Sequence, residues 1–147
     1  PGDVQRMSAG SGVRHSEFNA SRTNGVHFLQ IWIQPNVSDI PPSYEEKHFD
    51  PAEKRGRLRL IASPDGASGS VRIHQDARVY GGLFDAAEHA TLELAKGRRA
   101  YIHVARGSVH VNDLELHAGD ALKLTAEPVL EIGRGNHSEV LVFDLPG

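Results

Sequence analysis

Residues 99–117 read RAYIHVARGSVHVNDLELH, and this stretch decides the fold. Apolar residues alternate with polar ones in two runs, 100–104 and 109–111, which Arg106-Gly107 separates. Strict alternation is typical of β-strands with one buried face. Asn112-Asp113 is a turn signal, and the alternation resumes after it. The stretch therefore predicts consecutive antiparallel strands joined by short turns.

The same pattern fills the chain from Arg57 to Leu145. Short alternating runs follow one another at regular spacing, separated by turn residues, as in a β-sandwich or barrel. No segment shows a 3.6-residue period over helical length, although residues 51–54 are compatible with a single helical turn whose charges form a solvated face. We therefore expect an all-β protein with a complete antiparallel barrel over residues 57–145. Its interior should contain Leu92, Leu94, Ile102, Val104, Val109, Val111, Leu122, Ile132 and Val142.

The first fifty residues are organised differently. Val4 to Met7 predicts a short strand, and residues 26–33 predict the strongest strand of this region, with apolar side chains on both faces. Asn24-Gly25, just before that strand, is a hairpin signal. Because Pro41-Pro42 forbids regular strand pairing, we interpret residues 35–50 as a linker.

One motif in this region carries chemistry. His15 and Glu17 follow the glycine-rich turn at residues 9–12, on a segment that we expect to be a strand. Side chains two residues apart on a strand point to the same face, so the imidazole and the carboxylate should converge on one point. This donor pair suits iron, manganese, nickel, copper or zinc. A solvated strand face also accounts for such a pair, and two ligands alone do not make a metal site.

Composition excludes several classes of function. The 147 residues are 39% hydrophobic and 24% charged, the balance of an ordinary globular domain. The formal net charge of −3 gives no electrostatic case for nucleic acid or for an anionic membrane. No apolar run approaches the roughly 18 residues that span a bilayer. The chain has no cysteine, which excludes disulfides and thiol catalysis and fits a reducing, cytoplasmic compartment.

The wider sequence resembles a known family. Gly12, His15 and Asn19 have the spacing of the second half of the second cupin motif, with Gly10 where that motif has proline. Four segments resemble, in the same order, parts of the pirins, a family of two-barrel cupin proteins, and look closest to bacterial pirins described as quercetin 2,3-dioxygenases: residues 1–10, 12–17, 26–33 and 137–146.

The resemblance implies a fold and a cofactor. The expected fold is all-β, with cupin barrels of the double-stranded β-helix or jelly-roll type: the remainder of an N-terminal metal-binding cupin over residues 1–45 and a complete C-terminal cupin over residues 46–147. The cofactor would be a divalent transition metal, Fe(II) first and nickel, manganese, copper, zinc or cobalt otherwise, with His15 and Glu17 as ligands. Pirins carry a His-x-His pair upstream of this point, so we interpret the chain as a fragment and expect the other two ligands outside it.

The resemblance also implies a reaction, the 2,3-dioxygenation of a flavonol such as quercetin. The metal would lower the pKa of the substrate's 3-hydroxyl, and Glu17, as the catalytic base, would take that proton. Two non-enzymatic alternatives stay open. One is a transcription cofactor that senses the redox state of its metal, and the other is a metal-free cupin that acts as an interaction module.

The remaining histidines are weaker candidates. His27 shares a strand face with Leu29 and Ile31, so it is a candidate for orienting a metal ligand through a hydrogen bond, with a packed core histidine as the alternative. Ile132 takes the place of His15 when the segment after Gly119 is aligned with the segment after Gly2, so we expect no metal in the second barrel. Four histidines lie on the polar phase of alternating runs and should be exposed or hydrogen-bonded: His74, His103, His110 and His117.

A partial barrel leaves strand edges without partners. Open edges are templates for pairing with another chain. We therefore expect residues 4–7 and 26–33 to be covered by the absent N-terminal segment or by a second copy of the chain.

Overall fold

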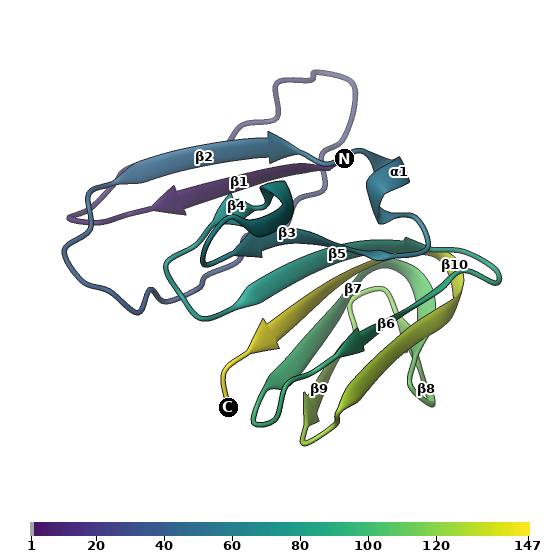
Figure 1. The fold of residues 1–147 in the computed structure, drawn as a ribbon. Helices are drawn as coiled ribbons and strands as arrows, with labels where there is room; N and C mark the ends of the chain where they lie inside the picture. The colour runs from purple at the N-terminus through teal and green to yellow at the C-terminus, as the bar shows by residue number, and fades with distance from the viewer. Residues whose placement is uncertain (1) are drawn as a thin grey trace.

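The computed structural model describes residues 2–147, and Pro1 lies outside the described residues. Strands are its main regular elements (Figure 1). In chain order its elements are β1 (Asp3–Ser8), β2 (Ser43–His48), α1 (Pro51–Lys54), β3 (Leu58–Ser63), the 3-10 turn η1 (Ala67–Gly69), β4 (Val71–Arg72), β5 (Arg78–Phe84), β6 (His89–Glu93), β7 (Arg99–Val111), β8 (Leu114–His117), β9 (Ala121–Thr125) and β10 (Val129–Leu145).

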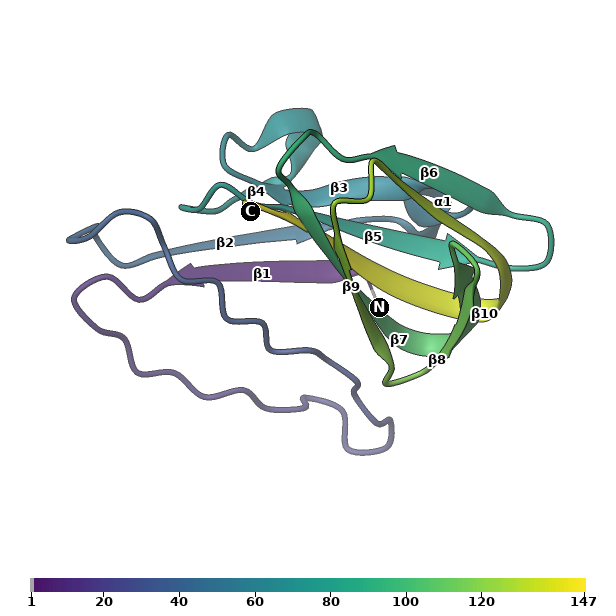
Figure 2. The same cartoon turned by 90° about the horizontal axis from the view of Figure 1, so that it is seen from below.

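Two long strands, β7 and β10, organise the barrel. They pair with each other in antiparallel fashion, and each has different neighbours at its two ends. The first part of β10 pairs with β6 and the later part with β5, whereas β7 pairs with β9 at its start and with β8 at its end. β3 and then β4 follow β5 in the sheet. β7 and β10 thus join the other strands of the barrel into one curved sheet (Figures 1 and 2).

The expected break at Arg106-Gly107 is wrong, because β7 bends there and continues. Gly107 has a φ of 67°, and a Cβ on it would lie 2.2 Å from the carbonyl oxygen of Asn136 on β10. Glycine allows both the left-handed backbone and this close approach. β10 shifts its register in the same region, between Gly133 and Val140.

The barrel interior is the one predicted. All nine expected side chains belong to one hydrophobic cluster, seven of them buried and Leu92 and Leu122 partly buried against it. Side chains on the other face of these strands are also buried. Phe143 and Val79 belong to a second cluster, against which Val4 of β1 and Ile33 pack. One sheet of the barrel is therefore buried on both faces.

The N-terminal part contains one small sheet. β1 and β2 pair in antiparallel register from Asp3 with His48 to Ser8 with Ser43. β1 confirms the predicted strand, but β2 lies inside the predicted linker and corrects it. Pro41-Pro42 blocks pairing only up to residue 42, and β2 begins at the next residue.

Residues 9–42 run between β1 and β2 without a helix or strand, and we call them the excursion (Figure 2). The strands expected around His15 and over residues 26–33 are therefore wrong for this structure. A strand needs a neighbour for its N–H and C=O groups. Within residues 2–147 no strand pairs with the excursion.

The predicted helical turn is α1. Asp50 caps it by accepting from the N–H of Ala52, and the side chain of Glu53 returns to the N–H of Asp50. Its expected solvated face is wrong for Lys54, which is only 6% exposed. No helix within residues 2–147 is long and apolar enough to cross a membrane.

Candidate metal centre

The predicted metal ligands lie near the start of the excursion. His15 and Glu17 are both exposed, and neither makes a hydrogen bond within the described residues 2–147. The turn before them depends on Gly10, where a Cβ would lie 2.3 Å from the carbonyl oxygen of Ile40. Glycine therefore lets the outgoing and returning arms of the excursion meet, as expected for a glycine-rich turn.

Tyr44 on β2 is a neighbour that the sequence analysis missed. Its hydroxyl donates to Oε2 of Glu46 at 2.7 Å. That hydrogen bond raises the pKa of Tyr44, and the negative charge of Glu17 contributes in the same direction. The sequence signal for the contact between Tyr44 and Glu46 was their spacing, because they lie two residues apart within the segment interpreted as a linker.

His27 is placed against the barrel. Its Nδ1 accepts from Nε of Arg106 on β7 at 3.5 Å. Further along, the excursion is held by the carbonyl oxygen of Gln34, which accepts from Gln75 at 2.8 Å, and by the N–H of Asn36, which donates to the carbonyl oxygen of His74 at 2.8 Å. The segment with His15 and Glu17 is thus tied to the barrel through side chains and single backbone groups.

The donor set suits a metal in kind but not in number. An imidazole and a carboxylate are ordinary ligands for first-row transition metals, whereas a catalytic zinc or non-haem iron site normally has three or more protein ligands. Within residues 2–147 no group of three or more His, Cys, Asp or Glu side chains is placed to hold a metal ion. His15 and Glu17 are thus a pair of donors that no third such side chain joins within residues 2–147.

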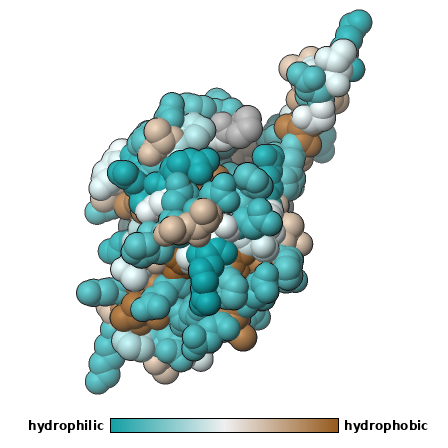
Figure 3. All heavy atoms as spheres, turned by 90° about the vertical axis from the view of Figure 1, so that its right-hand side faces the viewer, coloured by the Kyte–Doolittle hydropathy of each residue, from teal (hydrophilic) through white to brown (hydrophobic). Residues whose placement is uncertain are grey.

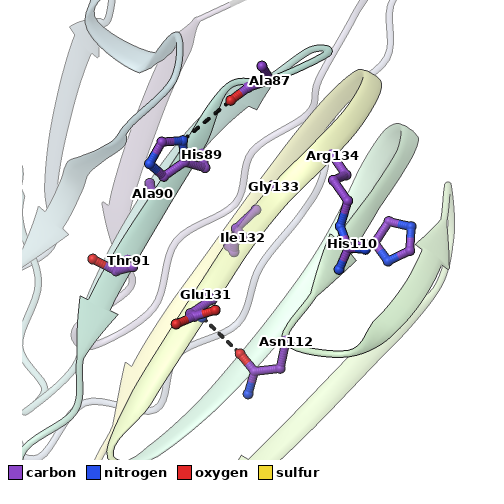
Figure 4. A pocket seen from close by; sticks show the side chains of 10 residues that line it. All are labelled: Ala87, His89, Ala90, Thr91, His110, Asn112, Glu131, Ile132, Gly133 and Arg134. Carbon is purple, nitrogen blue, oxygen red and sulfur yellow. Dashed lines mark hydrogen bonds between the residues drawn. The ribbon is translucent and has the colours of Figure 1, made fainter.

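A hollow of about 410 Å³ lies elsewhere, on the outer face of β6, β10 and β7 (Figure 4). Gly133 is its floor, and the register places His89 on one side of it and His110 on the other. Nδ1 of His89 donates to the carbonyl oxygen of Ala87 at 3.3 Å. Nδ1 of His110 is buried and has no partner within residues 2–147. The two imidazoles belong to strands on opposite sides of β10, and the hollow contains neither His15 nor Glu17.

A smaller hollow of about 160 Å³ lies beside the contact between Arg106 and His27. Charged side chains from four segments line it, among them Arg55, Asp85, Arg106 and Glu139. The end of the barrel seen in Figure 3 is mainly hydrophilic, with scattered hydrophobic side chains. Several large apolar side chains on the excursion, in contrast, are more than half exposed: Phe18, Val26, Phe28 and Trp32.

Two family models match the chain. The pirin family model matches residues 1–33, and the model of the quercetinase C-terminal cupin domain matches residues 60–145. The chain is 39% identical over 145 residues to quercetin 2,3-dioxygenase of Escherichia coli strain K12, covering 99% of this chain and 62% of that protein. The chain thus spans less than two thirds of the length of that relative.

Solved structures of a pirin and of a quercetin 2,3-dioxygenase also match the chain. A crystal structure of the bacterial pirin YhhW from Escherichia coli in complex with nickel(II) matches with a TM-score of 0.89 and 39% identity, over 99% of this chain and 62% of that one. A quercetin 2,3-dioxygenase from Acinetobacter baumannii, 15% identical, matches in fold alone with a TM-score of 0.60, over 99% of this chain and 56% of that one. The all-β barrel of β3 to β10 is a cupin domain. The chain belongs to the pirin family.

Proposed function

We propose that this chain is the C-terminal part of a metal-dependent pirin that cleaves flavonols such as quercetin with dioxygen. The observation that carries the proposal is the match of residues 1–33, which include His15 and Glu17, to the pirin model, within a chain 39% identical to a quercetin 2,3-dioxygenase. The nickel(II) bound by the pirin YhhW supports a divalent metal. We retain Fe(II) as the metal of first choice, with the other first-row metals as substitutes.

His15 and Glu17 supply two of the metal ligands in this proposal. The other two come from a His-x-His pair in a segment outside these 147 residues. A bound divalent metal supplies Lewis acidity, which lowers the pKa of a coordinated hydroxyl. His15 would hold the metal through one ring nitrogen, and the carboxylate of Glu17 would take the proton of the substrate's 3-hydroxyl. His27 then acts indirectly, by keeping this segment in place.

The two parts of the chain have different tasks in this proposal. Residues 1–45 belong to the metal-binding cupin, and residues 46–147 form a cupin without a metal. The exposed apolar side chains of the excursion pack against strands of the same cupin outside this chain, or against a second copy. A chain without cysteine is compatible with a reducing, cytoplasmic location.

The test uses a fusion protein in which the segment preceding the aligned region of the Escherichia coli dioxygenase is joined to residue 1 of this chain. Loaded with Fe(II) or nickel(II), it should consume quercetin in the presence of dioxygen, as measured by loss of quercetin absorbance. The His15→Ala and Glu17→Gln variants should lose this activity by about 100-fold or more. His117→Ala, an exposed histidine on β8, is the matched control and should keep it.

Two outcomes would contradict the proposal. A metal-loaded fusion protein that leaves quercetin unchanged would favour the non-enzymatic alternatives, a redox-sensing transcription cofactor or an interaction module. Activity that persists in both variants would show that His15 and Glu17 are not part of the site.

A further inference from the structure

The excursion is attached to the barrel by few contacts. Between residues 13 and 33, the hydrogen bond from Arg106 to His27 is the one polar contact with the rest of residues 2–147. The next anchors come only at Ile33, Gln34 and Asn36. Arg106 is therefore the one side chain of the barrel that makes a polar contact with residues 13–33 within the described residues.

Glu139 lies beside Arg106, and Lys54 lies beside Glu139. Arg106 stands opposite Glu139 in the register of β7 and β10, and its Nε lies 3.6 Å from Oε2 of Glu139. The other oxygen of Glu139 lies 4.0 Å from Nζ of Lys54. The side chains of Lys54 and Glu139 are 8% and 27% exposed. A buried ammonium needs a nearby opposite charge, so Lys54 fixes Glu139, and Glu139 fixes the head of Arg106.

Arg106 donates the hydrogen bond that joins β7 to the excursion. Nε of Arg106 donates to Nδ1 of His27 at 3.5 Å and lies 3.6 Å from a carboxylate oxygen of Glu139. The side chain of Arg106 is 48% exposed, and it reaches the excursion from the region where β7 bends at Gly107.

We propose that Arg106 is a positioning residue for the metal centre, with Glu139 and Lys54 as its support. The C-terminal cupin thereby orients the His15–Glu17 segment without supplying a ligand. The role at the metal rests on the proposed function, whereas the positioning of the segment stands independently of it. An exposed charge-assisted contact contributes about 1 kcal/mol at most, which corresponds to about fivefold in an equilibrium. Loss of Arg106 should thus weaken the site without abolishing it.

The absence of native cysteines allows a direct measurement of position. Ala20→Cys on the excursion and Thr125→Cys on β9, both at exposed positions, provide two unique sites for spin labels in the fusion protein once any cysteine of the added segment is replaced by serine. Pulsed electron paramagnetic resonance should give a narrow distance distribution. Arg106→Ala and His27→Ala should each broaden it, and the double variant should broaden it no further, because both changes remove the same contact.

Two further variants separate positioning from a general loss of structure. His27→Gln keeps an acceptor and should restore a narrower distribution. Arg134→Ala is the matched control, because Arg134 makes no hydrogen bond or ion pair within the described part of the chain and lines the other hollow. Thermal unfolding of the barrel should be unchanged in all of them.

Nickel(II) affinity of the unlabelled fusion protein is the second readout. It should fall about fivefold in Arg106→Ala and stay unchanged in Arg134→Ala. A distance distribution that Arg106→Ala leaves unchanged, or that the double variant broadens additively, would overturn the proposal. Failure of every fusion protein to bind nickel would instead contradict the proposed function, and the distance distributions alone would then decide whether Arg106 positions the segment.

Discussion

Residues 26–33 and residues 99–111 carry similar strand patterns and have different structures. The second run is β7, which has neighbours on both sides and whose alternate side chains are fully buried. The first lies in the excursion, has no strand neighbour within residues 2–147 and exposes most of its apolar side chains. Alternation therefore states which residues are able to form a strand, and pairing decides whether they do.

The largest expected effect is on stability. Ile102 is completely buried in β7, whereas Ile31 on the excursion is 46% exposed. Ile102→Ala should lower the free energy of unfolding by about 3 kcal/mol, because it leaves a cavity in the main cluster. Ile31→Ala should change it by less than about 0.5 kcal/mol. Denaturant unfolding followed by the fluorescence or circular dichroism of the chain measures both. Equal losses in the two variants would mean that the excursion is packed as tightly as the barrel.

A polar contact within the barrel should have an intermediate effect. Asp144 on β10 is 7% exposed, and its Oδ1 accepts from Nε of Arg98 at 2.6 Å. Asp144→Asn removes the negative charge beside Arg98 and should cost about 2 kcal/mol of the free energy of unfolding. Glu131→Gln, an exposed change on the same strand, is the control and should cost less than about 0.5 kcal/mol. Similar losses of unfolding free energy in the two variants would show that the contact between Asp144 and Arg98 contributes little to stability.

The smallest expected effect concerns how β2 is held to the barrel. The N–H of Arg72 donates to Oε2 of Glu45 at 3.0 Å, and Lys47 and Arg6 contact the same carboxylate. These contacts, the N–H of Arg72 first, hold the pKa of Glu45 below its ordinary value of 4.5. A lowered pKa in the folded state means that the stabilisation is present above pH 4.5 and is lost as the pH falls below it.

The corresponding experiment compares the free energy of unfolding of the unchanged chain and of Glu45→Gln between pH 7 and pH 3. The unchanged chain should lose about 1 kcal/mol more than the variant over this range. Parallel profiles would show that the carboxylate of Glu45 does not contribute through its charge.

The fold of residues 57–145 was readable from the sequence because each strand there has its partners within the chain. Alternation identified the interior down to single side chains such as Val104 and Val142. The bend of β7 at Gly107 was misread as an end, because a glycine that permits close approach looks the same in sequence as one that terminates a strand. The family resemblance was likewise readable, and the comparisons confirm it.

The candidate site was less predictable. Sequence spacing identified His15 and Glu17 as a donor pair, but their convergence remains a prediction, since no strand holds them within residues 2–147. The contact between His27 and Arg106 joins residues 79 positions apart, and no periodic pattern reports such a pair. The burial of Lys54 was missed for a similar reason, because its counter-charge, Glu139, is distant in sequence.

The metal content of the fusion protein tests the central claim most directly. Elemental analysis after nickel(II) loading and dialysis should give about one metal ion per fusion protein and about one for the His117→Ala control, since a site with four protein ligands binds tightly. His15→Ala should retain little metal. A His15→Ala variant that holds as much nickel as the unchanged fusion protein would contradict the account.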